Sequence, residues 1–210
     1  MEFGICHLSI VPLRKESSHK SELISQLLYG DCFKIISKKK EWLQITTLLD
    51  QYTGWIDYKQ SQIIIEEDAE EISFKTNSYS TNLVDYVQTS NNKLTTLIIG
   101  SNIGAAKVLN HEFNSDSIKG KKPKSNLINI ALLYLNSPYL WGGKTPMGID
   151  CSGLTQMIYR INGHNIPRDS SEQVKLGDTL SFIEESEAGD LVFFDDEDGN
   201  IVHVDYYFKI

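Results

Sequence analysis

Two residues in the last third of the chain carry the side chains needed for nucleophilic catalysis. Cys151 directly follows Asp150, and His203 comes 52 residues later. A thiol in the first turn of a helix lies near unpaired backbone N–H groups and the positive end of the helix dipole, which favours the nucleophilic thiolate. A histidine that reaches this thiolate can act first as a base and then as an acid. Spacing alone also fits a buried cysteine and a structural histidine.

The pattern around Cys151 predicts helices. Residues 151–161 place Leu154, Met157, Ile158 and Ile161 on one helical face. Residues 127–135 are long and apolar enough for a largely buried helix, capped by Ser125 or Asn126 and ending before a proline. A third, short helix is expected over residues 169–176.

Two strands are predicted around His203, at residues 191–194 and 201–204. The turn between them, residues 195–200, contains an Asp-Gly pair, which favours a hairpin. Helices followed by an antiparallel sheet indicate an α+β domain over residues 125–210.

The first 65 residues predict a small β-barrel, because short apolar runs recur there every 8–12 residues. Residues 21–31 have apolar positions that imitate a helix, but we interpret them as an arm that leads into a strand at Cys32. Five acids among residues 66–71 indicate a solvated connector. Residues 66–124 are then expected to hold a second, degenerate barrel-like unit with strands at 83–87, 94–99 and 106–109, followed by a basic linker at 117–124.

Composition excludes several classes of function. The chain has 210 residues, a formal net charge of −8 and a pI near 5.1, so a surface that follows nucleic-acid phosphates has little support. Its longest nearly unbroken apolar run, residues 128–135 with Asn129 inside it, is too short to span a membrane. Three cysteines without a paired motif make a disulfide scaffold or a metal site improbable, and we expect no cofactor. The start of the chain lacks a secretion signal, so we expect a cytoplasmic protein, or a periplasmic or cell-wall protein if this is a processed form.

Five sequence blocks in the last third resemble the NlpC/P60 family of cell-wall cysteine peptidases. They are PYLWGG at 138–143, GIDCSGL at 148–154, PR with SSEQ at 167–173, GDLVFF at 189–194 and HV at 203–204. The resemblance implies a papain-like domain, preceded here by N-terminal SH3-like barrels. It also implies that Cys151 is the nucleophile and His203 its base, acting on an amide of a peptidoglycan stem peptide.

The same resemblance suggests substrate-binding residues. Tyr139 is expected near the active site, either contacting substrate or packing under the helix. Asp150 and Ser152 flank the nucleophile, and helix capping would also explain Asp150. In relatives with SH3-like domains that cut γ-D-glutamyl-diamino acid bonds, an aspartate and a barrel tyrosine hold the free amine of L-alanine. Tyr52 is the best match for that tyrosine, and Glu16 is a candidate helper; the alternatives are a turn aromatic and a solvated carboxylate.

The chain departs from the family pattern after His203. The family places a polar residue that orients the histidine about a dozen residues further on, and this chain stops at Ile210. We therefore expect reduced activity, and we expect Tyr206, Tyr207 and Phe208 to be exposed on an incomplete sheet. The main hypothesis is an endopeptidase of murein recycling that cuts peptides with a free L-Ala. A non-catalytic cell-wall peptide binding protein and an acyltransferase or amidase of the same broad fold are the alternatives.

Overall fold

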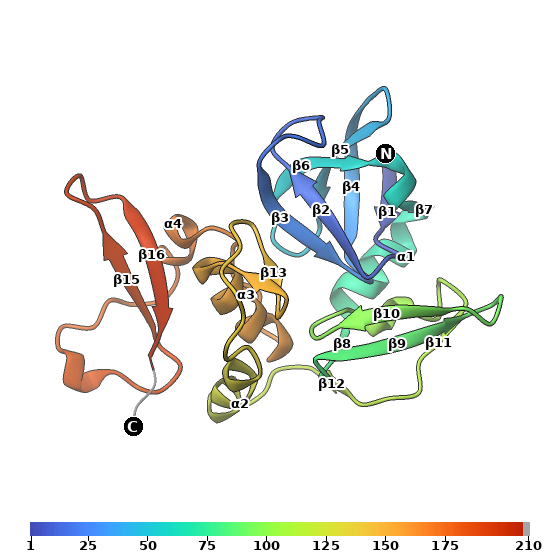
Figure 1. Cartoon of the computed structure of the whole chain (residues 1–210). Coiled ribbons are helices and arrows are strands. Elements are labelled where there is room, and N and C mark those ends of the chain that lie inside the picture. The colour runs from blue at the N-terminus through green and yellow to red at the C-terminus, as the bar shows by residue number, and fades with distance from the viewer. Residues whose placement is uncertain (208–210) are drawn as a thin grey trace.

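The N-terminal part is an SH3-like antiparallel sheet. A computed structural model describes residues 1–207, and its first seven strands follow the order β3-β2-β6-β5-β4-β1-β7 (Figure 1). The sheet is open, because β3 and β7 are its edges. The strands are β1 (Glu2–Ile5), β2 (Ile10–Arg14), β3 (Leu23–Leu28), β4 (Cys32–Lys39), β5 (Trp42–Thr47), β6 (Thr53–Asp57) and β7 (Gln62–Ile64), with the 3₁₀ helix η1 at Tyr58–Gln60.

The segment interpreted as an arm contains a true strand. β3 pairs with β2 in a register that aligns Leu28 with Ile10 and Leu27 with Val11. Ser25 and Leu27 are buried, two residues apart on one face. The expectation of an arm is therefore wrong for residues 23–28, and this edge strand faces the C-terminal domain.

The acidic connector is helical rather than irregular. It forms α1 (Glu66–Glu70) and continues as a π-helix, η2 (Glu71–Lys75). Most of its acids are solvated as predicted, but Ala69 and Ile72 are buried in a cluster with Phe3 and Ile5 of β1. The acidic block therefore also packs one apolar side against the N-terminal sheet.

The second unit has two small sheets and one unexpected turn. The structure gives β8 (Ser78–Ser80), β9 (Val84–Thr89), β10 (Leu94–Ile98), η3 (Ile103–Ala105), β11 (His111–Glu112) and β12 (Ser117–Lys119). The expectation of a strand at 106–109 is wrong, because these residues form a turn that continues from η3. The Asn102 side chain caps η3 by accepting a hydrogen bond from Gly104 N. The expected linker is partly ordered, because β12 pairs with β8.

The C-terminal domain begins with two helices and two short strands. They are α2 (Ser125–Leu133), β13 (Lys144–Thr145), β14 (Gly148–Ile149) and α3 (Cys151–Ile161). The predicted cap of α2 is wrong, because its N-cap is Lys124 and makes no side-chain hydrogen bond. The Asn126 amide instead donates to Asn162 Oδ1 at 2.6 Å. The exposed side chains of Leu132 and Leu133 show that the end of α2 is less buried than expected.

The domain ends in the predicted hairpin. α4 (Ser170–Gln173) and η4 (Ile183–Glu185) precede β15 (Leu191–Asp195) and β16 (Ile201–Tyr206). In Figure 1 this hairpin lies on the far side of α3 from the SH3-like sheet. Tyr206 is only 5% exposed, so the expectation that it faces water is wrong; Tyr207 is half-buried, and Phe208 lies outside the described residues.

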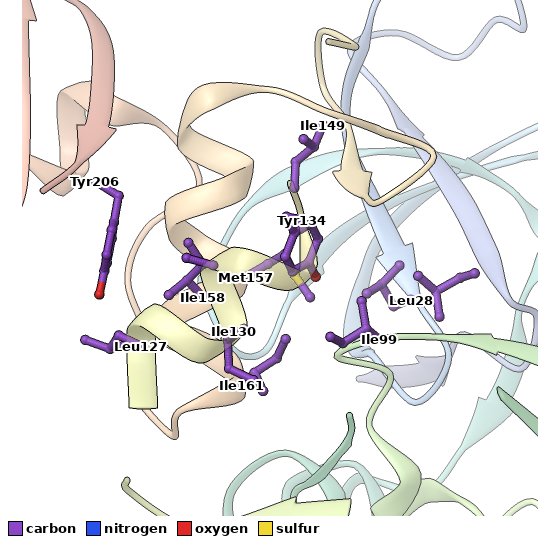
Figure 2. Close-up of a cluster of buried hydrophobic side chains, with 12 residues drawn as sticks. Leu28, Ile99, Leu127, Ile130, Tyr134, Ile149, Met157, Ile158, Ile161 and Tyr206 are labelled. Atoms are coloured by element: carbon purple, nitrogen blue, oxygen red, sulfur yellow. The ribbon is translucent and has the colours of Figure 1, made fainter. Parts of the chain in front are cut away.

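One hydrophobic core joins all three parts of the chain. Figure 2 shows Leu28 of β3 and Ile99 of the second unit on one side of the crossing helices α2 and α3, with Tyr206 on the opposite side. Met157 of α3 is fully buried in this cluster. A side chain at Gly100 would approach Met157 Cε to 2.2 Å, so the second unit packs directly against the helix that carries Cys151. The orientation of that helix is thus fixed by residues distant in sequence.

Candidate active site

Cys151 is the first residue of α3, as the sequence predicts. The helix starts there because Asp150 is its N-cap, with extended backbone angles and a side chain that accepts from Gly153 N at 2.7 Å. Cys151 is half-buried, unlike the fully buried Cys6 and Cys32. Its thiol is the one most accessible to a substrate.

Asp150 uses both carboxylate oxygens within the protein. Oδ1 accepts from Gly153 N and, at 3.5 Å, from the Ser152 hydroxyl, while Oδ2 accepts from Gly142 N at 2.8 Å. Arg168 Nη2 adds an ion pair to Oδ2 at 2.7 Å. A carboxylate has about four acceptor sites, so these four donors fill the side chain. The capping interpretation of Asp150 is confirmed, and a substrate amine would have to compete with internal donors.

Arg168 is the central charge of this arrangement. It is 2% exposed. Besides Asp150, its Nη1 donates to Ser152 Oγ at 2.8 Å and its Nε to Ser25 Oγ of β3 at 3.1 Å. Ser152 is therefore held internally as well. The planar guanidinium fixes both neighbours of Cys151 and ties them to the SH3-like domain.

Gln173 completes the wall behind the nucleophile. Its amide donates to Ser152 O at 3.0 Å and to Pro167 O at 2.8 Å, and its carbonyl accepts from the Thr155 hydroxyl at 2.8 Å. Both Arg168 and Gln173 lie in the sequence block at 167–173, but that block gave them no role. Their place in this block was the only sequence signal that marked them. That they hold the residues around Cys151 is visible only in the tertiary structure.

Tyr139 lies at the open side of the site. Its side chain is largely exposed, and a β-bridge joins its backbone to Ile149, two residues before Cys151. Burial raises the pKa of the Tyr139 hydroxyl, and the nearby Cys151 and Asp150 raise it further. These effects favour the protonated hydroxyl, which is the form that donates a hydrogen bond.

Tyr52 reaches the C-terminal domain from the SH3-like sheet. Its hydroxyl donates to Asp169 Oδ1 at 3.0 Å, next to Arg168 in the chain. Burial and the Asp169 carboxylate raise the pKa of Tyr52 above its usual value. The structure thus brings this barrel tyrosine to the same region as the start of α3.

Glu22, at the end of the β2–β3 loop, contacts the C-terminal domain through its carboxylate. Its Oε1 accepts from Trp141 Nε1 at 2.8 Å, and its Oε2 pairs with Lys15 at 3.0 Å. These two donors lower the pKa of Glu22. Glu16 is exposed, and among residues 1–207 its carboxylate makes no hydrogen bond or ion pair. Sequence reasoning missed Glu22, because nothing in the pattern shows which carboxylate of this loop meets Trp141.

His203 lies on β16, paired in register with Phe194 of β15. The two rings are 5.7 Å apart between centroids, and His203 is exposed. Its neighbours Val204 and Tyr206 are buried. Within the part of the chain that the structure describes, no hydrogen bond joins the His203 ring to Cys151. The catalytic pairing of these two residues therefore stays a proposal.

Among residues 1–207, no group of three or more His, Cys, Asp or Glu side chains could hold a metal ion. In the same residues, no helix is both long and apolar enough to cross a bilayer.

Comparison with known proteins identifies the domains. Residues 136–209 match the NlpC/P60 family, and residues 13–60 match the bacterial dipeptidyl-peptidase SH3 domain. The chain therefore contains an NlpC/P60 domain and an N-terminal bacterial SH3 domain, and these domains together with the named relatives support hydrolase activity. Its α+β fold, with an SH3-like domain before a papain-like domain, agrees with the fold implied by the sequence blocks.

Individual relatives extend this assignment. The gamma-D-glutamyl-L-lysine dipeptidyl-peptidase of Bacillus subtilis is 27% identical over 209 residues, covering 87% of this chain and 68% of the relative. Dipeptidyl-peptidase 6 of Lysinibacillus sphaericus is 28% identical over 218 residues, covering 87% of this chain and 78% of the relative. The crystal structure of an NlpC/P60 family protein from Bacillus cereus has a TM-score of 0.80 at 19% identity, covering 99% of this chain and 88% of that chain. This structural likeness shows a shared fold.

Proposed function

We propose that this protein is a cysteine peptidase that hydrolyses the bond between γ-D-Glu and the diamino acid in peptidoglycan stem peptides with a free N-terminal L-Ala. The observation that carries the proposal is the supported start of α3. There Cys151 is accessible, and buried Arg168 fixes the residues on both sides of it. The name of the Bacillus subtilis relative, gamma-D-glutamyl-L-lysine dipeptidyl-peptidase, supports this class of bond, and the name of the Lysinibacillus sphaericus relative supports dipeptidyl-peptidase chemistry.

The reaction would follow the general course of thiol acyl transfer. The Cys151 thiolate attacks the carbonyl carbon of the γ-glutamyl amide, and the Tyr139 hydroxyl would stabilise the developing oxyanion. His203 takes the thiol proton and passes it to the leaving amine of the diamino acid. Water then hydrolyses the thioester, returning the proton to Cys151 and releasing the L-Ala-γ-D-Glu dipeptide.

Specificity would come from the SH3-like domain. In this proposal Tyr52, with Glu16 or Glu22 of the β2–β3 loop, binds the N-terminus of a short peptide, and the hydrogen bond from Tyr52 to Asp169, next to Arg168, supports it. A carboxylate or a tyrosine hydroxyl in a partly dehydrated site binds an ammonium group well. A site closed in this way would favour short, already released peptides over intact wall polymer, as in murein recycling.

The test is direct hydrolysis. The purified chain is incubated with L-Ala-γ-D-Glu-L-Lys, its meso-diaminopimelate equivalent and N-acetylated forms of both, and the products are identified by mass spectrometry. We expect release of the dipeptide from free-amine substrates only, and no product with Cys151→Ser. Equal cleavage of acetylated peptides would reject recognition of the free amine.

A non-catalytic peptide-binding protein is the second candidate. The exposed position of His203, without a hydrogen bond to Cys151 in the described residues, favours it. Calorimetry on the same peptides separates the two functions, because binding of the free-amine peptide without any hydrolysis would support the second.

A further inference from the structure

Four charged side chains and one amide meet between the SH3-like domain and α3. We call this set, Asp31, Asp50, Lys144, Gln156 and Arg160, the interdomain charge cluster. It borders a cavity of about 30 Å³, lined from the SH3-like side by turns after β3 and β5 and from the other side by α3 and β13. The three residues of the C-terminal domain are each at most 5% exposed.

Most members of the cluster have specific partners. Arg160 pairs with Asp31, whose other oxygen accepts from Leu28 N at 2.9 Å. Asp50 accepts from Gln156 Nε2 at 2.8 Å and also binds the Thr47 hydroxyl. Arg160 further lies over the Tyr79 ring, 5.0 Å from its centroid, and so also contacts the second unit.

Lys144 is the member of the cluster whose charged group has no such partner. Its backbone N–H donates to Gln26 Oε1 of β3 at 2.7 Å. Its ammonium makes no hydrogen bond and no ion pair within 4.0 Å among residues 1–207. Lys144 as a whole is only 4% exposed. An ammonium with so little access to water and without a direct partner is costly, and the group reduces this cost by releasing its proton.

We propose that Lys144 makes the docking of the SH3-like domain on α3 dependent on pH, because the docked interface holds this side chain best in its neutral form. Undocking exposes Lys144 to water, where it binds a proton as an ordinary lysine does. Docking therefore strengthens as pH rises. This goes beyond the peptidase function and does not require it, although docking also delivers Tyr52 and Glu22 to the site.

The other groups facing Lys144 set the range of pH. Burial and then Arg160 lower the pKa of Lys144 to about 8, with Arg168 acting in the same direction. Asp31 and Asp50 oppose this shift. Cys32, which also lines the cavity, is neutral in this range, since burial raises the pKa of its thiol to about 12.

Proton linkage determines whether docking strengthens or weakens as pH rises. Between pH of about 8 and the ordinary lysine pKa of about 10.4, the undocked or unfolded chain binds more protons at Lys144 than the docked chain. The docked state therefore gains stability as pH rises through this window, with an equilibrium constant that changes up to about tenfold per pH unit.

The first experiment uses the unaltered protein. Lysines labelled with ¹³C at Cε are followed by NMR from pH 6.5 to 11.5. We expect one signal to titrate near pH 8 and to be missing in Lys144→Met. Titration of every lysine signal above about pH 10 would overturn the proposal, whether or not the variant folds.

The second experiment measures stability without substrate. Urea unfolding of the wild type, Lys144→Met and Lys144→Arg is compared between pH 7 and 10.5, with the exposed Lys175→Met as the matched control. The ratio of the wild-type folding constant to that of Lys144→Met should rise with pH, approaching tenfold per unit above pH 8. Lys144→Arg, which keeps its charge, should lose the same pH dependence. Parallel profiles for wild type and Lys144→Met would reject the proposal, and loss of peptidase activity alone would not affect it.

Discussion

Arg168 Nη2 lies 2.7 Å from Asp150 Oδ2 in a buried ion pair beside Cys151. The same guanidinium binds Ser152 and Ser25, so one side chain connects the start of α3 with the SH3-like domain. An arginine fits this position because its planar fork serves several acceptors at once.

Arg168→Met should strongly destabilise the protein, by about 3–5 kcal/mol, because it leaves the Asp150 charge buried and unpaired. Arg168→Lys retains the positive charge but lacks the planar guanidinium that binds several acceptors. Because Cys151 would then be displaced, kcat/KM should fall at least about tenfold. Urea unfolding and peptide hydrolysis measure the two effects. As a control, Lys175→Met breaks an exposed pair with Glu172 and should cost no more than about 1 kcal/mol. An Arg168→Met protein as stable as this control would contradict the interpretation.

Tyr52→Phe removes the hydrogen bond to Asp169, and the expected loss of stability is about 0.5–1.5 kcal/mol. If Tyr52 also binds the substrate amine, KM for free-amine peptides should rise while kcat changes little. Tyr58→Phe, at an exposed position of the same domain, is the matched control. Because the pKa of Tyr52 is raised, its phenolate absorbance should appear above the pH of ordinary tyrosines, and the titration step should be missing in Tyr52→Phe.

Glu22→Gln and Glu16→Gln separate the roles of the two carboxylates in the β2–β3 loop. Glu22 holds Trp141 and Lys15, so its replacement should raise KM for free-amine peptides and alter Trp141 fluorescence. Glu16→Gln should leave the fluorescence unchanged. A KM effect confined to Glu16→Gln would instead favour the residue chosen from the sequence.

Met157→Ala should destabilise the whole protein by about 2–5 kcal/mol, because Met157 is fully buried in the core that joins all three parts. Met147→Ala changes an exposed methionine and should fall within about 0.5 kcal/mol of wild type. Thermal unfolding compares them. Two separate transitions in Met157→Ala, with the SH3-like domain unaffected, would show that the shared core does not couple the parts.

Asp190 anchors the segment before β15 to α2 through Lys124 at 2.7 Å. Burial acts to raise the pKa of Asp190, but hydrogen bonds from Glu187 N and Lys124 outweigh it and lower that pKa. A lowered acid pKa stabilises the fold above the unfolded value of about 3.9, and this contribution disappears as pH falls through the folded value. Asp190→Asn should thus be slightly less stable than wild type at pH 7 and equal to it near pH 2. A constant difference over this range would contradict the linkage.

The sequence by itself determined the local elements around the candidate site and the positions of the candidate catalytic residues on them. The 3.6-residue spacing of Leu154, Met157, Ile158 and Ile161 predicts α3, and the Asp-Gly turn predicts the β15–β16 hairpin, because both signals lie within a few residues. Cys151 at a helix start also follows from adjacent residues.

Only the tertiary structure decided the long-range partners. Ser25 and Arg168 are 143 residues apart, and Glu22 and Trp141 are 119 apart. No periodicity records such contacts, since they depend on how separate elements pack. The same holds for the interdomain charge cluster and for Tyr206, which is buried against α2 and α3. Local patterns place residues on elements, and burial then depends on which other surfaces cover them.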